Sequence, residues 1–220
     1  MAVFGIEGAA SALARPLDKL TAEIRACRIC RDAPRGKPLP HEPRPVFRVS
    51  PTARIGVFGQ APGTRVHASG VPFSDPSGVR LRQWMGVSDD EFYDVRRIAI
   101  IPMGFCFPGL DAKGGDLPPR AECAPLWRAR LLAQLPKLER GLLVGRYAHA
   151  WHLGSRQAAT LGETVAGWRA ATSLADGAMR VWPLPHPSWR NNAWLKKNPW
   201  FEGELLPALR RDVRSILDKD

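Results

Sequence analysis

The chain has 220 residues, which is long enough for one large domain or two small ones with a buried core. Lys and Arg outnumber Asp and Glu by 32 to 21, for a formal net charge of +11. This excess favours a polyanionic partner such as a nucleic acid, because phosphate contacts supply much of the affinity of such complexes. A coding bias toward Arg would explain the choice of Arg over Lys but not the excess over acids. No apolar run is long enough to span a membrane, which argues against a membrane partner.

The first residues lack the basic segment and the full apolar segment of a signal peptide, so we expect a cytoplasmic protein. Between residues 9 and 26, leucine and isoleucine recur at steps of three and four, which predicts a helix with one apolar face. Proline and arginine dominate residues 32–52, and this density of proline predicts an ordered surface loop. We expect residues 1–220 to form a single domain, in which the helix and loop of residues 1–53 wrap the core.

The stretch RIGVFGQAPGTRVHASGVPFSDPSG organises the rest of the chain. Its apolar run, residues 55–58, predicts a buried strand, and the Gly- and Pro-containing turn at residues 59–63 ends that strand. Open α/β sheets bind ligands beyond the carboxyl ends of their strands. A second turn, residues 70–73, brings one aromatic ring nearby. We therefore predict a pocket with a polar amide from Gln60 and a flat wall from Phe73, suited to a planar ligand of nucleobase size. The alternative is a structural turn with the ring of Phe73 in the core.

All four cysteines of the chain form one candidate site, with Cys27 and Cys30 in a C-x-x-C pair that is followed by Cys106 and Cys123. Four thiolates suit a [4Fe–4S] cluster or a tetrahedral zinc ion. Zinc sites usually pair their ligands twice at short spacing, and the gap between Cys106 and Cys123 is longer than that. The spacing therefore fits zinc poorly, and it leaves a cluster, a zinc ion and buried free thiols as the alternatives.

Further along the chain, short apolar runs alternate with amphipathic segments. Strands are predicted at residues 97–102, 141–145 and 180–184, and helices at 77–85, 118–135, 146–153 and 204–217, with a short helix started by a capping box at Ser88. This alternation predicts an α/β fold, a three-layer αβα sandwich around a central, mostly parallel four-stranded sheet. Residues 156–177 are poorly patterned, and we assign no function to them. His149 and His152 lack partners at metal-binding spacing, and we interpret them as surface or core residues.

A second motif, HPSWRNN at residues 186–192, follows the last predicted strand. Together, GQAPG followed by GVPF, the four cysteines and HPSWRN resemble the uracil-DNA glycosylase superfamily, and most of all its bacterial and archaeal branches that carry an iron–sulfur cluster. The resemblance covers residues 27 to about 201. It implies the fold of that superfamily, a [4Fe–4S] cluster on the four cysteines, and hydrolysis of the N-glycosidic bond of uracil in DNA. No lysine occupies either motif, so lyase chemistry is not expected. We also expect a monomer that acts on nucleoid DNA.

The resemblance also implies roles for single residues. His186 would donate a hydrogen bond to O2 of the departing base, where negative charge develops. Phe73 would stack on the base after it flips out of the duplex. The catalytic candidates are Gln60, His186 and His67, and the uracil-binding candidates are Gln60, Ala61, Gly63, Phe73, His186 and Asn191. We expect DNA contacts from Ser188, Trp189, Arg190, Lys196 and Lys197, with the lysines on phosphates.

Three positions depart from the pattern of the family. Gln60 stands where iron–sulfur glycosylases often carry Glu, Ala61 where the best-known branch carries Asp, and Pro102 where related sequences carry an Asn that reads the uracil edge. Gln cannot act as a general base near neutral pH and can only orient a water, so His67 and Asp75 are the nearest titratable alternatives. These departures support a second hypothesis, a protein that binds uracil or abasic DNA with little turnover. A third, an electron-transfer protein, is disfavoured by the basic charge and the pocket motifs.

Overall fold

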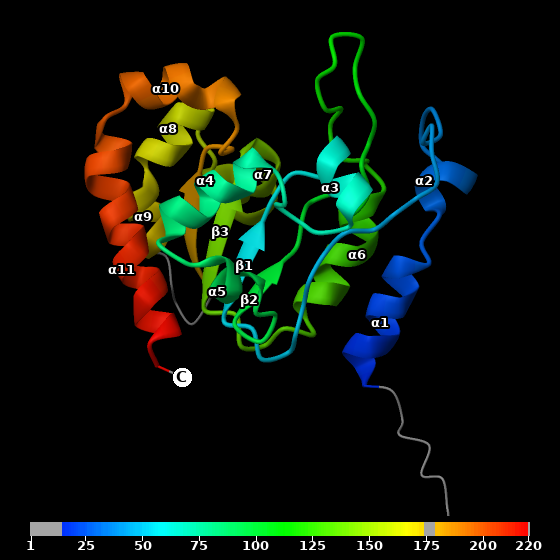
Figure 1. The fold of residues 1–220 in the computed structure, drawn as a ribbon, viewed down its shortest axis with the longest axis horizontal. Coiled ribbons are helices and arrows are strands. Elements are labelled where there is room, and N and C mark those ends of the chain that lie inside the picture. Colours follow the sequence, from blue (N-terminus) through cyan, green and yellow to red (C-terminus); the bar gives the residue numbers. More distant parts are fainter. Residues whose placement is uncertain (1–14, 174–178, 220) are drawn as a thin grey trace, which may run out of the picture.

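A computed structural model of the chain describes residues 15–173 and 179–219, and its centre is one sheet of four parallel strands (Figure 1). The strands are β1 (Ile55–Phe58), β2 (Ile98–Ile100), β3 (Arg140–Val144) and β4 (Arg180–Leu184), in the order β2-β1-β3-β4. In the register of the sheet, Ile55 lies opposite Ile98 of β2 and Arg140 of β3. The predicted α/β fold is confirmed, and every pairing between these strands is parallel.

Helices connect the strands and cover both faces of the sheet. They are α1 (Pro16–Arg25), α2 (Ile29–Asp32), α3 (Thr64–Ser69), α4 (Pro76–Met85), α5 (Asp89–Tyr93), α6 (Cys123–Leu132), α7 (Arg146–Leu153), α8 (Leu161–Ala166), α9 (Trp168–Ser173), α10 (Asn192–Lys197) and α11 (Leu206–Leu217). Short 3₁₀ turns occur at Gly154–Arg156 and Trp189–Asn191, and a π turn occurs at Phe201–Leu205. Among the described helices, none is both long enough and apolar enough to cross a bilayer.

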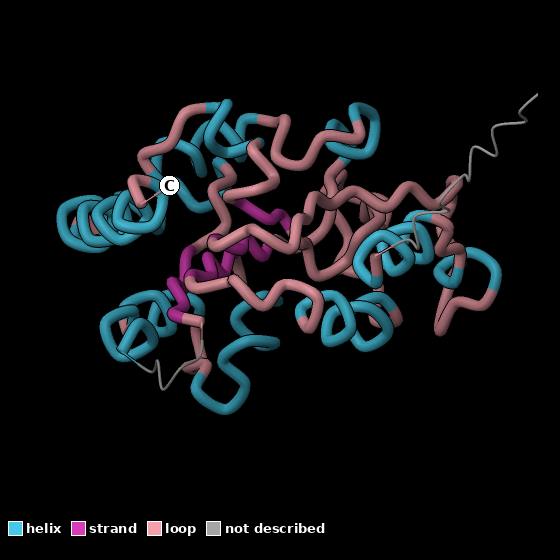
Figure 2. Tube along the Cα trace, turned by 90° about the horizontal axis from the view of Figure 1, so that it is seen from below, coloured by secondary structure: helices cyan, strands magenta, loops and turns pink. Residues whose placement is uncertain are grey.

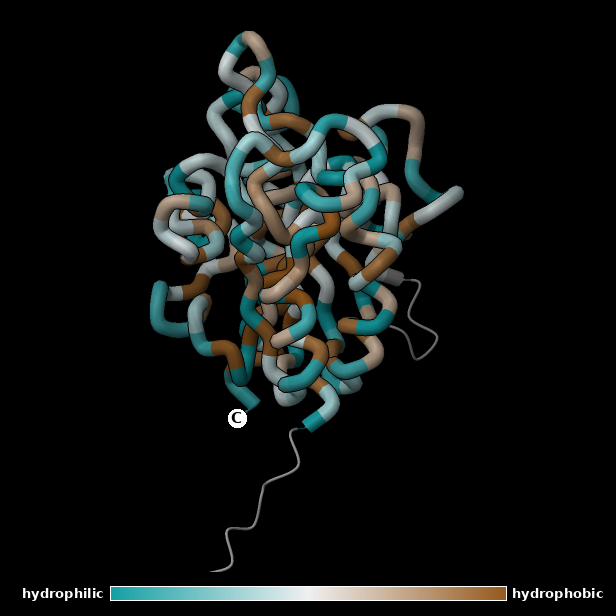
Figure 3. The backbone as a smooth tube through the Cα atoms, turned by 90° about the vertical axis from the view of Figure 1, so that its right-hand side faces the viewer, coloured by the Kyte–Doolittle hydropathy of each residue, from teal (hydrophilic) through white to brown (hydrophobic). Residues whose placement is uncertain are grey.

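Successive side chains of each strand point to opposite faces of the sheet, and this alternation builds two cores. Val57 packs in one core and its neighbour Phe58 in the other, and Leu142 and Leu143 divide in the same way. The first core contains side chains of α4, α5, α8, α9 and α11, and the second contains side chains of α1, α6 and α7. Figure 2 shows the strands between these helical layers, and Figure 3 shows apolar segments gathered inside the trace. The sheet is therefore the middle of three layers.

Some element boundaries differ from those that the sequence predicts. The helix predicted over residues 9–26 is observed as α1, and residues 9–14 of that prediction lie outside the described part of the chain. The helix predicted from Pro118 begins only at Cys123, and the two residues before it, Ala121 and Glu122, form a turn. The last helix begins at Leu206, after a π turn.

Several helices had no sequence prediction, among them α3, α8 and α9. Helix α8 begins with a capping box in which Oγ1 of Thr160 accepts from the N–H of Glu163, while the Glu163 carboxylate accepts from the N–H of Thr160. The T-x-x-E spacing is therefore a readable signal for α8. Residues 174–178 of the unassigned segment lie outside the described residues.

The prediction that His149 and His152 are core or surface residues is confirmed. A ring nitrogen of His149 lies 2.9 Å from the carbonyl oxygen of Leu143, and a ring nitrogen of His152 lies 2.7 Å from the guanidinium of Arg128. Burial lowers the pKa of both histidines, that of His152 to about 3. Both rings therefore serve the packing of the core.

Candidate active site and cysteine cavity

A cavity of about 610 Å³, which we call the base cavity, opens at the carboxyl ends of the strands, where open α/β sheets bind ligands. Its wall combines the turn after β1, the chain that leaves β2, the aromatic turn before α4 and the segment after β4. It gathers the sequence-predicted residues Gln60, Ala61, Gly63, Phe73, His186, Ser188, Trp189, Arg190 and Asn191. The fold thus brings the two sequence motifs together in one cavity.

The turn after β1 is held against the chain that follows β2. The carbonyl oxygens of Gly59 and Gln60 accept hydrogen bonds from the N–H groups of Met103 and Gly104, both at 2.9 Å. These bonds continue the pairing of β1 with β2 beyond the strands, and Pro102 contributes to the same cavity wall. Because a proline ring offers no polar side chain, the amide in this part of the wall comes from Gln60.

Phe73 has a backbone φ of 54°, in the left-handed region that is costly for a bulky residue. Its carbonyl oxygen accepts from the hydroxyl of Tyr93 at 3.1 Å and from the guanidinium of Arg82 at 3.2 Å. A side chain at Gly78 would clash with this carbonyl group, since a Cβ at that position would lie 1.7 Å from the oxygen of Phe73. The half-buried ring lines the base cavity and meets Phe92 edge-on. The surrounding residues therefore stabilise a strained backbone that presents one aromatic ring to the cavity, and Tyr93 and Arg82 had no functional signal in the sequence.

His186 follows β4 and is held by its own segment. Nδ2 of Asn191 donates to the carbonyl oxygen of His186 at 2.6 Å, so this amide fixes the motif as well as lining the cavity. From α4, Arg80 donates to the carbonyl oxygen of Ser188 at 3.3 Å, a contact that the sequence did not suggest. Burial lowers the pKa of His186, and the carboxylate of Asp75 acts in the opposite direction. A neutral imidazole in this position can donate a hydrogen bond without bringing a charge.

Of the residues expected to bind DNA, Ser188, Trp189 and Arg190 line the base cavity, whereas Lys196 and Lys197 do not. Trp189 is 72% exposed, the largest value among the described large apolar side chains, and the guanidinium of Arg190 lies 5.6 Å from its ring. Lys196 and Lys197 end α10 and are exposed. An exposed indole with a guanidinium beside it is suited to a partner with both stacked rings and phosphates.

His67 does not line the base cavity, contrary to the expectation that it stands near the reacting atoms. Its ring packs against His41 and Phe107, with centroid separations of 4.4 and 5.7 Å. Burial lowers the pKa of His67, and the nearby His41 and Arg44 lower it further. The ring is engaged with the proline-rich loop, so its geometry does not suit catalysis in the cavity.

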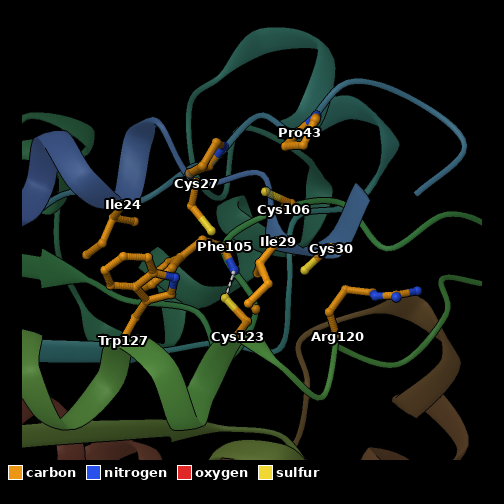
Figure 4. Close-up of a pocket in the computed structure, with 12 residues that line it drawn as sticks. Ile24, Cys27, Ile29, Cys30, Pro43, Phe105, Cys106, Arg120, Cys123 and Trp127 are labelled. Carbon is orange, nitrogen blue, oxygen red and sulfur yellow. Dashed lines mark hydrogen bonds between the residues drawn. The ribbon is translucent and has the colours of Figure 1, made fainter. Parts of the chain in front are cut away.

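The four cysteines meet in a second, smaller cavity between α1, α2, the chain after β2 and the start of α6, which we call the cysteine cavity (Figure 4). Cys30, Cys106 and Cys123 are buried, and Cys27 is partly exposed. The remaining wall is mostly apolar and includes Ile24, Ile29, Pro43, Phe105 and Trp127. The backbone N–H of Phe105 donates to Sγ of Cys123 at 3.3 Å. Burial raises the pKa of Cys106 and of Cys123 to about 12.

The chemistry of this donor set fits an iron–sulfur cluster. Four sulfurs from three segments of the chain face one mostly apolar cavity, and an N–H group points at one of them, as is common around cluster ligands. Among the described residues, no group of three or more His, Cys, Asp or Glu side chains is arranged to hold a single metal ion. Cys27, Cys30, Cys106 and Cys123 are the residues that would hold such a cluster.

A parallel sheet between helical layers, with a ligand-sized cavity at the carboxyl ends of its strands, defines an α/β protein of the class that binds its ligand at this edge of the sheet. Residues 47–210 match the family model described as the Uracil DNA glycosylase superfamily, and the chain belongs to this superfamily. Membership assigns it to the DNA glycosylases, hydrolases of DNA repair. The matched range includes both sequence motifs, Cys106 and Cys123, and it begins after Cys27 and Cys30.

Proposed function

We propose that this protein is a monofunctional uracil-DNA glycosylase, which hydrolyses the N-glycosidic bond of uracil in DNA and leaves an abasic site. The observation that carries the proposal is that Phe73 and His186, from motifs far apart in the sequence, line one cavity with the turn after β1. The net charge of +11 supports a DNA partner. The protein would act as a cytoplasmic monomer on uracil-containing DNA of the nucleoid.

Capture of the base comes first. A base inside a duplex is out of reach, so it must rotate out of the stack into the cavity. The ring of Phe73 would stack on the extruded base, and the exposed ring of Trp189 would fill the space left in the duplex. Lys196 and Lys197 would bind the flanking phosphates.

Cleavage of the bond follows. As the bond between N1 and C1′ lengthens, its electron pair moves to the base and positive charge develops on the sugar. The neutral ring of His186 would donate a hydrogen bond to O2 of the base as negative charge grows there. One preorganised donor of this kind typically contributes on the order of 10²–10³ to the rate.

In this scheme, the side chain of Gln60 would recognise uracil. Its amide offers both a hydrogen-bond acceptor and a donor, which match the N3–H and O4 edge of uracil. Pro102, in the same wall, can contribute only shape. Backbone N–H groups of the turn from Gln60 to Gly63 would complete the set of donors.

We propose further that Cys27, Cys30, Cys106 and Cys123 hold a [4Fe–4S] cluster with a structural role. When bound, the cluster would cross-link the N-terminal helices to the chain after β2 and to the start of α6. Iron and acid-labile sulfide should be found at about four each per chain in brown, anaerobically purified protein. Colourless protein with one zinc per chain would refute the cluster.

A second candidate function is a protein that binds uracil or abasic DNA with little turnover. One observation favours it, namely that Gln60 and Ala61 put no carboxylate in the turn after β1.

The two functions separate in one assay. Matched oligonucleotides that carry uracil or thymine at one position are incubated with the protein, in single- and double-stranded form. Glycosylase activity gives free uracil and an equal amount of alkali-labile sites in the uracil strand alone. Tight binding of the uracil strand without release of base would support the binding protein instead.

A further inference from the structure

The long loop between β2 and α6 places one of its carboxylates in the wall of the base cavity. Residues 109–117 form a small hairpin, which Figure 1 shows projecting beyond α3. The backbone N–H of Asp111 donates to the carbonyl of Gly115 at 2.8 Å, and Asp116 forms an antiparallel bridge with Leu110. Asp116 therefore lies at the base of the hairpin rather than at its tip, and its side chain lines the mouth of the cavity.

The carboxylate of Asp116 reaches the turn after β1. An atom at the Cβ position of Gly63 would lie 3.3 Å from Oδ2 of Asp116. Because Gly63 has no side chain, the carboxylate can approach the backbone of this turn. Gln60 and Ala61 of the same turn carry no acidic group. A residue distant in sequence thus supplies an acid beside the turn.

The cavity has a second carboxylate, that of Asp75, but it is engaged in the fold. Oδ1 of Asp75 accepts from the N–H of Gly78 at 3.1 Å and caps α4. The side chain of Asp116 makes no hydrogen bond or ion pair with any residue in the described ranges. Asp116 therefore has a carboxylate that no structural contact occupies.

We propose that Asp116 is the general base of the hydrolysis, an inference that rests on the proposed function. The oxygen of a water molecule forms a bond to C1′ while the bond between C1′ and N1 breaks. The electron pair of the broken bond leaves with the base, which departs as an anion that His186 stabilises. One proton of the water passes to the carboxylate of Asp116 and later returns to solvent or to the base.

The electrostatic surroundings suit this role. Asp116 is exposed in the absence of DNA. Desolvation by its neighbours raises the pKa of its carboxyl group, the positive charge of Arg190 lowers it, and the carboxylates of Asp75 and Asp111 raise it. A carboxylate with a raised pKa is a better proton acceptor than one in open water. Bound DNA would cover the exposed mouth of the cavity and strengthen these interactions.

The test compares Asp116→Asn with Asp111→Asn under single-turnover conditions on uracil DNA. Both changes remove one negative charge from the same hairpin. The carboxylate of Asp111 accepts from the N–H groups of Lys113 and Gly115, both at 2.8 Å, and Asn at position 111 keeps an acceptor for them. We expect Asp116→Asn to slow release of uracil by about 10²–10⁴-fold, the usual contribution of a general base, and to leave DNA binding intact. Asp111→Asn should remain close to wild type.

The pH profile supplies a readout that a structural role would not change. The wild-type rate should rise with pH as Asp116 loses its proton, and this rise should be absent from the pH–rate profile of Asp116→Asn. Any change of rate that comes from the titration of His186 should remain in both proteins. Asp116→Glu should recover part of the rate. An Asp116→Asn protein as active as Asp111→Asn, with the acidic limb intact, would overturn the inference and leave the glycosylase function standing. Wild-type protein that releases no uracil would overturn both.

Discussion

The base cavity and the cysteine cavity are built in opposite ways. The base cavity measures about 610 Å³, opens to the surface and mixes polar side chains with one aromatic ring. The cysteine cavity is smaller, and its wall consists mostly of apolar side chains such as Ile24 and Trp127. An open, partly polar cavity admits and releases a ligand, whereas an apolar wall keeps water away from the groups that it encloses.

The two cavities also differ in that backbone strain lies in one of them and buried thiols lie in the other. Among the described residues, Phe73 is the one non-glycine residue with a positive φ, and it lies in the base cavity. Backbone strain of this kind tends to lie where a ligand binds. The cysteine cavity instead buries thiols between three segments of the chain. Substitutions in the base cavity should therefore change rates more than stability, and substitutions in the cysteine cavity should do the reverse.

The largest effect is expected from Cys123→Ala. Loss of one ligand should release the proposed [4Fe–4S] cluster, and a structural metal site contributes on the order of 10 kcal/mol to folding. The melting temperature and the iron content should both fall sharply. The control is Trp127→Phe, which alters the same wall, removes an indole N–H that has no partner and keeps the four sulfurs. A Cys123→Ala protein that melts like wild type but is inactive would contradict the structural role.

The next effect is expected from His186→Ala. Loss of the donor to O2 should slow the chemical step by about 10²–10³-fold, while the melting temperature and DNA binding stay nearly unchanged. Single-turnover release of uracil measures the step. His67→Ala is the matched control, because the ring of His67 packs against His41 outside the base cavity. Equal losses of rate in the two variants would remove His186 from the mechanism.

A smaller effect is expected from Phe73→Ala, which removes the stacking ring. Capture of the extruded base should weaken by roughly 1–3 kcal/mol, the value of one base–aromatic stack. Titrations with uracil DNA and with undamaged DNA measure it, and only the first should change. Phe73→Gly loses the same ring but relieves the positive φ, so it should be more stable than Phe73→Ala. Equal weakening on both DNAs would argue that Phe73 supports the fold and not the base.

The smallest effect per residue is expected from Lys196→Glu and Lys197→Glu. Each exposed lysine should contribute to binding of all DNA sequences alike, and its loss should reduce the slope of log affinity against log salt by about one. Lys19→Glu on α1, which Figure 1 shows far from α10, makes the same charge change as a control. Identical slopes for the three variants would mean that net charge, and not the end of α10, governs affinity.

The strands could be predicted because their signals are local, whereas their order in the sheet comes only from the structure. An apolar run such as residues 55–58 between polar or turn-forming residues is visible without knowledge of the rest of the chain, and β1 has those bounds. The capping box at Ser88 is equally local and is present in the structure. Helix starts were less predictable, since α6 begins at Cys123 and not at the predicted Pro118.

By itself, the sequence determined the chemical types present at the site, namely the amide of Gln60, the ring of Phe73, the imidazole of His186 and a set of four thiols. Only the tertiary structure decided which further side chains reach the base cavity. It brought in Asp116 from a distant hairpin, and it kept His67 packed against His41. The physical reason is that these positions depend on the paths of long loops, which are set by contacts between segments far apart in the chain.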